Sequence, residues 1–563
     1  MNDPPTIFHH KTKIMQLRNG CLLLALSAIM LMGCNKENPN PENRITAAKI
    51  EEHVKIMASD AFLGRQPGTI GEPITIQYIE DQFKEIGISP AVGDSYFQEF
   101  EITEVAPIPP DIMTIKTGTK ELTFKVKEDF IAQTPKVDEL VSIKDKEIVF
   151  LGFGIVAPEY NWDDYQDIDV QDKIVMVLYN DPGLYTEDDN LFQGVAPSKY
   201  SSSTYKKEEA FKRGAAGMLT IFHDTGLTGL NWGLVQALAT RPTRYLANQE
   251  PEQHESLPFS GMISIAMAKT LIRESGQDFD YIKKALGKDF KPLPLGLMAS
   301  VDVMSQKRNF KTNNVLGVLK GKSRPEEIIV YTAHWDHDGY VKNSTEKDSV
   351  YNGAIDNATG VAMVLETARA FNELDQAPER SILFFLTSAE EMGLLGSNYY
   401  AQNPIFPLNQ TVCVINADAS HATEPMRVAV NVLKGYSDEM DKVVDSAATL
   451  LGREIIPDPT PQIGAFYRSD HFPFVEKGVP AVWSVGGGDP MEGDSIQQLK
   501  IIEDYSKRYH QLNDDYYEGF IAKNIAFDAQ LNFLVGYLLS NSEEWPNWNE
   551  DVEYRKIRDE SRM

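Results

Sequence analysis

The sequence predicts an α/β protein whose C-terminal half is built on a mostly parallel sheet, with a β-rich insertion before it. From residue 309 onward, long apolar strands alternate with helical segments. Between residues 105 and 308 the pattern changes to shorter strands and turns. Alternating strands and helices are typical of a parallel sheet that is covered by helices. A chain of 563 residues is also too long for one ordinary core, so we expect two or three domains.

The overall composition is that of a globular protein with an acidic surface. Hydrophobic residues make up 42% of the chain and charged residues 24%, which is ordinary for a soluble domain. The chain has 54 Lys and Arg against 82 Asp and Glu, a formal net charge of −28. Such a field repels nucleic acid and anionic lipid alike, so the composition excludes nucleic acid as a partner.

The N-terminus has the pattern of a secretion signal. Basic residues precede an apolar stretch at 21–30 that has signal-peptide length and is too short for a comfortable membrane span. The stretch ends in Leu-Met-Gly-Cys at 31–34, which resembles the lipobox of bacterial lipoproteins. The resemblance implies a lipoprotein signal peptide at 1–34, a lipid on Cys34 as the one membrane attachment, and a place in the bacterial cell envelope, periplasmic or on the outer membrane. A short buried helix is the alternative.

The cysteine content agrees with this prediction. The chain contains Cys21, Cys34 and Cys413 and no other cysteine. After signal cleavage and lipidation only Cys413 stays free, so we expect no intramolecular disulfide. Cys413 lies in the apolar run TVCVINAD and is expected to be a small buried hydrophobic residue.

The remaining chain divides into four parts by composition and by the spacing of its apolar residues. Residues 35–46 are polar and carry prolines, which predicts a tether. Residues 47–104 hold two segments with apolar residues three and four apart and one alternating strand, and we expect them to share a domain with residues 309–541. Residues 105–308 form the insertion. Residues 542–563 are expected to be a polar C-terminal tail.

Four predicted strands of the C-terminal half end in residues of interest. EEIIVYTA ends at His334, SILFFLTSA at Glu390, TVCVINA at Asp418 and AVWSV at Gly486. In an open α/β sheet, ligands bind beyond the carboxyl ends of the strands. Three of the four ends therefore place a metal-competent side chain where a ligand is expected. The glycine run has no following Lys-Ser or Lys-Thr, so it predicts a strand-end turn and not a phosphate site.

Three further residues extend this candidate metal site. Asp356 lies at a glycine-bracketed turn in GAIDNATG, Glu391 follows Glu390 directly, and His510 lies in RYHQLNDD. Adjacent glutamates after a strand are also typical of a solvated loop, which is the alternative for this pair. Two histidines and four carboxylates give mixed nitrogen and oxygen donors, which suit zinc better than magnesium or calcium.

Two aspartates are candidates for orienting the histidines. Asp336 lies two residues after His334, and a metal-bound imidazole usually donates its second N–H to a carboxylate. Asp514 lies four residues after His510 and is a candidate for the same role there. Asp336 is therefore counted with the catalytic residues.

Five short motifs, AHWDH, GAIDNATG, EEMGLLGS, NAD and YH, follow one another between residues 331 and 514. Their order resembles the di-zinc aminopeptidases of peptidase family M28. The resemblance implies two zinc ions per chain, one held by His334, Asp356 and Asp418 and the other by Asp356, Glu391 and His510. It also implies that Glu390 is the general base. Ile355 departs from the acidic residue that is frequent before the bridging aspartate, which removes no ligand.

The resemblance extends beyond the motifs. ASDAFLGRQPGTIGE, in residues 47–104, looks like the N-terminal part of M28 peptidases. FLGFGIVAPEYNWDDY and KRGAAGMLTIF, within residues 105–308, look like a protease-associated (PA) domain. The sequence assigns no role to Arg65 in LGRQPG.

The segment YRSDHFPF carries candidates for substrate contact. Asp470 and His471 resemble a segment near the substrate pocket of the family, and Tyr467 is a candidate for stabilising an oxyanion. For all three, a structural role is the alternative.

The sequence therefore predicts a secreted, lipid-anchored zinc aminopeptidase that removes N-terminal residues from peptides. A carboxypeptidase-like or glutaminyl-cyclase-like zinc enzyme is one alternative, and Arg468 is the arginine beside a motif that could hold a substrate carboxylate. A non-catalytic, receptor-like ectodomain is the other alternative, but such a relative is expected to have lost ligands. The pattern predicts neither the oligomeric state nor the preferred side chain.

Overall fold

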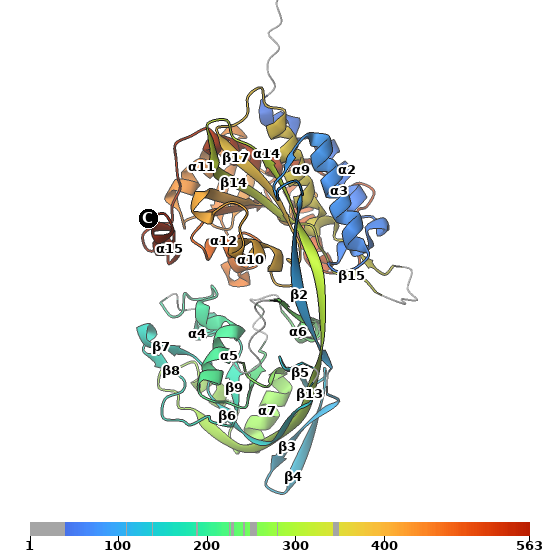
Figure 1. The fold of residues 1–563 in the computed structure, drawn as a ribbon. Helices are drawn as coiled ribbons and strands as arrows, with labels where there is room; N and C mark the ends of the chain where they lie inside the picture. The colour runs from blue at the N-terminus through green and yellow to red at the C-terminus, as the bar shows by residue number, and fades with distance from the viewer. Residues whose placement is uncertain are drawn as a thin grey trace, which may run out of the picture.

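The computed structural model describes residues 40–563, apart from 109, 138, 187, 189, 224–225, 227–229, 240–241, 248–255, 279 and 342–347. These residues form two bodies joined by a pair of long strands (Figure 1). We call residues 40–104 and 309–563 the main body, and residues 110–303 the inserted body. Residues 1–39 lie outside the described chain, and with them the predicted signal peptide, Cys34 and the first part of the tether.

The main body is built on a mixed sheet with a parallel centre, so the predicted mostly parallel sheet is confirmed. The central strands are parallel and run in the order β17 (Arg380–Thr387), β14 (Arg324–His334), β18 (Thr411–Asn416) and β21 (Ala481–Gly486). Antiparallel pairs occur toward the edges, where β13 (Leu293–Leu319) pairs with β17 and β19 (Val428–Asn431) pairs with β21. Beyond β19 lies β20 (Glu454–Pro457).

Helices cover both faces of this sheet because its strands are apolar on both faces. All of β17 is buried, as expected of a central strand in a parallel sheet. Its residues alternate between two cores, with Phe384 in one and Phe385 in the other. The first core includes residues of α2 (Ala47–Met57), α3 (Gly71–Ile86), α9 (Thr359–Asn372), α11 (Asp438–Leu450) and α14 (Lys523–Ser540). The second includes residues of α10 (Leu395–Gln402) and α12 (Phe472–Val475), which lie toward the inserted body (Figure 1).

The inserted body has its own sheet and its own core. Its strands run in the order β5 (Phe130–Gln133), β12 (Ser260–Ile263), β10 (Gly217–Ile221), β9 (Ile174–Leu178), β6 (Val141–Phe150), β13, β3 (Ile112–Thr117) and β4 (Lys120–Lys125). Met176 of β9 faces a core that includes α7 (Ile265–Glu274), and Val177 faces one that includes Ala210 of α5 (Ser203–Lys212). The body is therefore a helix-covered sheet with a parallel centre, more regular than the sequence predicts.

The two bodies are connected by continuous strands. β2 (Phe97–Ile108) pairs antiparallel with β13 along its whole length, from Phe97 opposite Val315 to Ile108 opposite Met304. β13 then continues into the inserted sheet, where it pairs with β6 and β3. The boundaries expected at residues 105 and 308 therefore fall inside two strands, because one strand serves both sheets.

Both ends of the described chain pack against the main body. Glu42 and Ile45, in the segment predicted as a tether, are buried. In the C-terminal segment, Trp548 is 1% exposed and its indole N–H donates to the Gly478 carbonyl at 2.9 Å. Arg558 of α15 (Tyr554–Ser561) is equally buried, so residues 542–563 are polar in composition but form part of the fold. Among the described residues, none of the helices has the length and apolarity needed to cross a membrane.

Replacing Trp548 with alanine tests the packed C-terminal segment. Removal of a buried indole leaves a cavity and an unpaired carbonyl, so W548A should lower the free energy of unfolding by about 3–5 kcal/mol. Chemical denaturation of the main body measures this loss. The control I496A changes a residue that is 65% exposed and should stay within about 0.5 kcal/mol of the parent. Equal stability of both variants would contradict the packed arrangement.

Candidate metal centre

Five segments of the main body meet where the parallel strands end. His334 is the last residue of β14, Glu390 follows β17, and Asp418 follows β18. Parallel neighbours end at the same edge of a sheet, so these three side chains come together from distant positions in the sequence. Asp356 comes from the turn that precedes α9, and His510 follows α13 (Ser495–Arg508). All predicted metal-binding residues lie in this one region.

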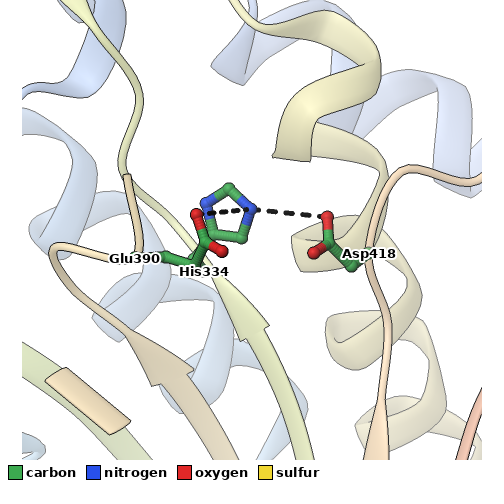
Figure 2. Close-up of side chains that lie close together, drawn as sticks. All are labelled: His334, Glu390 and Asp418. Carbon is green, nitrogen blue, oxygen red and sulfur yellow. Dashed lines mark ion pairs between the residues drawn. The ribbon is translucent and has the colours of Figure 1, made fainter. Parts of the chain in front are cut away.

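The first group of side chains is centred on His334. Its Nε2 lies 3.2 Å from Asp356 Oδ1 and 3.4 Å from Asp418 Oδ1. Glu390 Oε2 is farther away, at 3.9 Å from the same nitrogen. Figure 2 shows the imidazole of His334 between the carboxylates of Glu390 and Asp418. One ligand atom each of His334, Glu390 and Asp418 lies within 4.8 Å of the other two, which is close enough for the three to hold one cation.

The second group is centred on His510. Its Nε2 lies 3.2 Å from Asp356 Oδ2 and 3.2 Å from Glu391 Oε2. The two oxygens of Asp356 thus face different histidines, one in each group. This is the arrangement of a carboxylate that bridges two cations.

The charges of these buried groups depend on one another. Burial alone would lower the pKa of His510, but the charges of Glu391 and Asp356 raise it to about 9. Burial alone would also lower the pKa of His334, but the charges of Glu390 and Asp418 outweigh burial and raise this pKa well above its ordinary value. For Glu390, burial raises the pKa well above the ordinary value; His334 opposes this rise, while Glu391 and Asp418 add to it. Two imidazolium charges thus offset part of the negative charge of the metal-free site.

This set of donors fits divalent cations. Buried carboxylates that lie close together are unfavourable unless a positive charge compensates them. Here each of two groups offers one imidazole nitrogen and two carboxylate oxygens, and Asp356 belongs to both. Mixed nitrogen and oxygen donors at this number suit zinc. Zinc therefore fits these residues.

His337 is a site residue that the sequence analysis missed. It is buried, and its Nδ1 lies 2.7 Å from Glu391 Oε1. The other oxygen of Glu391 is the one that faces His510, so His337 orients the carboxylate. The run AHWDH contains His337 three residues after His334, and that spacing was the available signal.

The two aspartates expected to orient histidines have other contacts. The carboxylate of Asp336 lies 3.9 Å from His334 Nδ1 and accepts hydrogen bonds from the backbone N–H groups of Glu390 and Glu391, at 3.1 and 3.3 Å. His334 Nδ1 faces the Asp336 backbone carbonyl instead, at 3.2 Å. The Oδ2 atom of Asp514 accepts hydrogen bonds from the backbone N–H groups of Ile355 and Asp356, both at 3.1 Å. Both aspartates therefore position carboxylate-bearing segments and not imidazoles.

The predicted substrate residues are placed differently from one another. Asp470 and His471 are fully buried, where Thr387 donates to Asp470 and His471 Nε2 faces the Phe466 carbonyl at 2.9 Å. Both residues are buried, and the contacts that the structure shows for them are structural, as the alternative has it; substrate contact stays a prediction. Their neighbour Ser469 donates to Asp418 Oδ2 at 2.5 Å and orients that carboxylate.

The tyrosine nearest the carboxylates is also not the one expected. Tyr467 packs against Phe466 and Phe472, with ring centroids 4.9 and 5.1 Å apart. The ring of Tyr509 instead lies tilted by 35° against that of His510, with the ring centroids 3.9 Å apart. Burial raises its pKa well above the ordinary value, and the nearby charges of Asp356, Glu391 and Glu390 add to the rise. Tyr509 therefore lies among the site carboxylates, where Tyr467 was predicted.

A cavity of about 460 Å³ lies in the inserted body, on the side that meets Met392 of the main body. Its walls include Ile131, Tyr179 and Met262 of the inserted body, and Met392 of the main body. Met392 follows Glu391 directly, so the cavity adjoins the segment that bears the two glutamates. Its size is that of a small-molecule or peptide pocket.

Comparison with known proteins finds similarity over part of the chain. Residues 314–525 match the model of peptidase family M28. The chain is 32% identical over 143 residues to aminopeptidase NAALADL1 of Rattus norvegicus, which covers 24% of this chain and 18% of that protein. It is 29% identical over 202 residues to the glutamate carboxypeptidase 2 homolog of Caenorhabditis elegans, and this match covers 34% of this chain and 24% of that protein. The chain thus matches no more than about a quarter of either relative.

A solved structure supports the fold over most of the chain. The aminopeptidase from Aneurinibacillus sp. strain AM-1 superposes with a TM-score of 0.54 at 19% identity, covering 91% of this chain and 96% of that one. At this level of identity the likeness shows a shared fold.

Zinc binding should release protons at neutral pH. In the metal-free protein the pKa of His510 is about 9, so this imidazole is protonated at pH 7 and must lose its proton to bind metal. Apparent zinc affinity should therefore rise as pH increases, by about tenfold per pH unit for each proton released, and level off above about pH 9. Titration calorimetry in buffers of different ionisation enthalpy counts the protons. H510Q should release fewer, and zinc binding without proton release would contradict the charge state described.

Proposed function

Because residues 314–525 match the model of peptidase family M28, we propose that the protein is a zinc-dependent aminopeptidase that removes N-terminal residues from peptides. The observation that carries the proposal is the bridging placement of Asp356 between His334 and His510, with Glu390 beside it. The mixed donor chemistry and the family match support it together.

The proposal assigns five residues to the two metals. One zinc would be held by His334, Asp356 and Asp418, and the other by Asp356, Glu391 and His510. Zinc bound here would lower the pKa of water and polarise the peptide carbonyl. Ser469 and His337 contact the carboxylates of Asp418 and Glu391 from outside, and Asp514 holds the backbone N–H of Asp356.

Glu390 is the proposed general base. It lies 3.9 Å from His334 Nε2, near the ligands but outside the closest contacts. Its carboxyl is buried, and in the metal-free protein burial and the charges of Glu391 and Asp418 raise its pKa. It would take a proton from the attacking water and deliver it to the leaving amine. Asp336 holds the backbone of this segment through the Glu390 N–H. The Tyr509 hydroxyl is the proposed donor to the developing oxyanion.

Cleavage from the N-terminus is the finer part of the proposal. A free substrate ammonium would be attracted to the carboxylates that crowd the site. The match to a carboxypeptidase homolog keeps a carboxypeptidase as the second candidate, and Arg468, which is exposed on the loop before Ser469, is the residue that would hold a substrate carboxylate. A non-catalytic ectodomain is disfavoured because every proposed ligand is present and in place.

The proposal also covers the parts outside the metal centre. We assign the inserted body to a PA domain that bounds the cavity beside Met392 and would help to hold the peptide there. We further propose attachment to the cell envelope through a lipid on Cys34, which the lipobox-like sequence supports.

Substituting Glu390 with glutamine tests the general base. E390Q keeps the shape of the side chain but removes the proton acceptor, so kcat should fall by about 10²–10⁴-fold while both zinc ions remain bound. Steady-state kinetics together with metal analysis measure this. E518Q, an exposed glutamate elsewhere on the main body, is the matched control and should keep parental activity. Retained turnover in E390Q would remove Glu390 from this role.

A mixed peptide library tests the direction of cleavage. Half of the library carries free N-termini and half is N-acetylated, and mass spectrometry follows digestion by the zinc-loaded protein. Stepwise loss of N-terminal residues from the free half is expected, because acetylation removes the ammonium that the site attracts. Trimming from C-termini would identify the carboxypeptidase, and N-terminal pyroglutamate would identify the cyclase.

A further inference from the structure

Arg65 lies at the centre of the main body although no sequence pattern assigned it a role. It follows α2 in the short helical segment Asp60–Arg65 and is 0% exposed. Leu63, Gly64 and Arg65 all have positive φ angles, at 51°, 65° and 53°. A side chain on Gly64 would meet the Gly339 carbonyl oxygen at 2.0 Å, so only glycine allows this close approach. The sequence LGR thus turns the Arg65 side chain into the protein interior.

The guanidinium of Arg65 binds four backbone carbonyls from three segments. Its Nε donates to Trp335 O at 2.9 Å, and its Nη2 donates to Gly353 O at 2.9 Å. Its Nη1 donates to Met57 O at 2.9 Å and to Asn352 O at 2.5 Å. The planar fork of an arginine satisfies several acceptors at once in a fixed geometry, which an ammonium cannot do.

The carbonyls that Arg65 binds belong to the segments that bear metal ligands. Trp335 lies between His334 and Asp336, and Gly353 lies three residues before Asp356. Between these two segments the chain forms the short antiparallel pair of β15 (Gly339–Tyr340) and β16 (Val350–Tyr351), which ends two residues before Gly353. Arg65 therefore joins the backbone that carries the first histidine to the backbone that carries the bridging aspartate.

The charge of Arg65 also acts on the site. Burial lowers its pKa to about 10, against the opposing effect of Asp514, Asp356 and Asp336, so the group stays positively charged at neutral pH. All four hydrogen-bond acceptors are neutral carbonyls, and the carboxylates act on it from a distance. Arg65 is thus a fixed positive charge behind a cluster of buried carboxylates.

We propose that Arg65 is a positioning residue that holds the segments of His334 and Asp356 at metal-binding distance before any metal arrives. The proposal rests on the metal centre described above and adds a residue that touches neither metal nor substrate. Residues that orient ligands from outside typically change metal affinity by about 10–100-fold when they are replaced.

The test compares R65K with R558K. Arg558 is a matched control because it is 1% exposed, donates to the carbonyls of Leu408 and Thr411, and also has a pKa lowered to about 10 by burial. Arg558 lies on α15, next to the core of the main body that includes Phe385, and not next to the metal centre. Both variants should be less thermostable than the parent without metal. Zinc affinity, measured by competition with a chromogenic chelator, should fall about 10–100-fold in R65K and stay unchanged in R558K. Equal zinc affinity in the two variants would overturn the proposal.

Hydrogen exchange of the metal-free parent protein gives an independent answer if R65K does not fold. Peptides spanning residues 334–337 and 352–356 should be as protected as those of β17, because the segments are held without zinc. Rapid exchange in these peptides, with β17 protected, would overturn the proposal. A parent protein that binds no zinc would refute the proposed function instead, and the same exchange data would still show whether the two segments are held in place without metal.

Discussion

The carboxylate of Asp356, placed between two histidines, is the constraint on which the rest of the site depends. Each of its oxygens lies 3.2 Å from a different imidazole nitrogen. To hold a buried carboxylate in this position the protein must fix its backbone and balance its charge. Asp514 fixes the backbone through two N–H groups, and the imidazoles lower the pKa of Asp356 well below its usual value despite burial.

The fold supplies the other ligands in two ways. The parallel strands β14, β17 and β18 bring His334, the glutamate pair and Asp418 to one edge without further help, since their register fixes where each strand ends. Asp356 and His510 come from turns, whose positions no sheet determines. Additional hydrogen bonds from buried polar groups are found at the turns and at the ends of the strands, and they fix the direction of the side chains there.

The same distinction explains how much the sequence could predict. Strand ends are visible as apolar runs followed by polar residues, so the mostly parallel sheet was predicted and is confirmed. The hydrogen-bond partners of Asp336 and Asp514 were not predicted. A carboxylate that is near a histidine in sequence can bind any N–H group that the fold brings closer. Arg65 and His337 could not be predicted from sequence either, because their partners are far away in the chain: Arg65 binds the carbonyls of Trp335 and Gly353, and His337 contacts Glu391. The bounds of the insertion were also invisible, because β13 runs through both sheets without a break.

That continuous strand ties the inserted body to the catalytic segment. Within β13, Asn314 Oδ1 accepts from the Ser388 N–H at 3.0 Å, and Thr312 Oγ1 lies 2.6 Å from Ser388 Oγ. Ser388 is two residues before Glu390, so the strand that leads into the inserted body also braces the start of the glutamate turn. Asn313 adds its carbonyl, which accepts from the Trp335 indole at 3.1 Å. These contacts couple the position of β13 to the segments that carry His334 and Glu390.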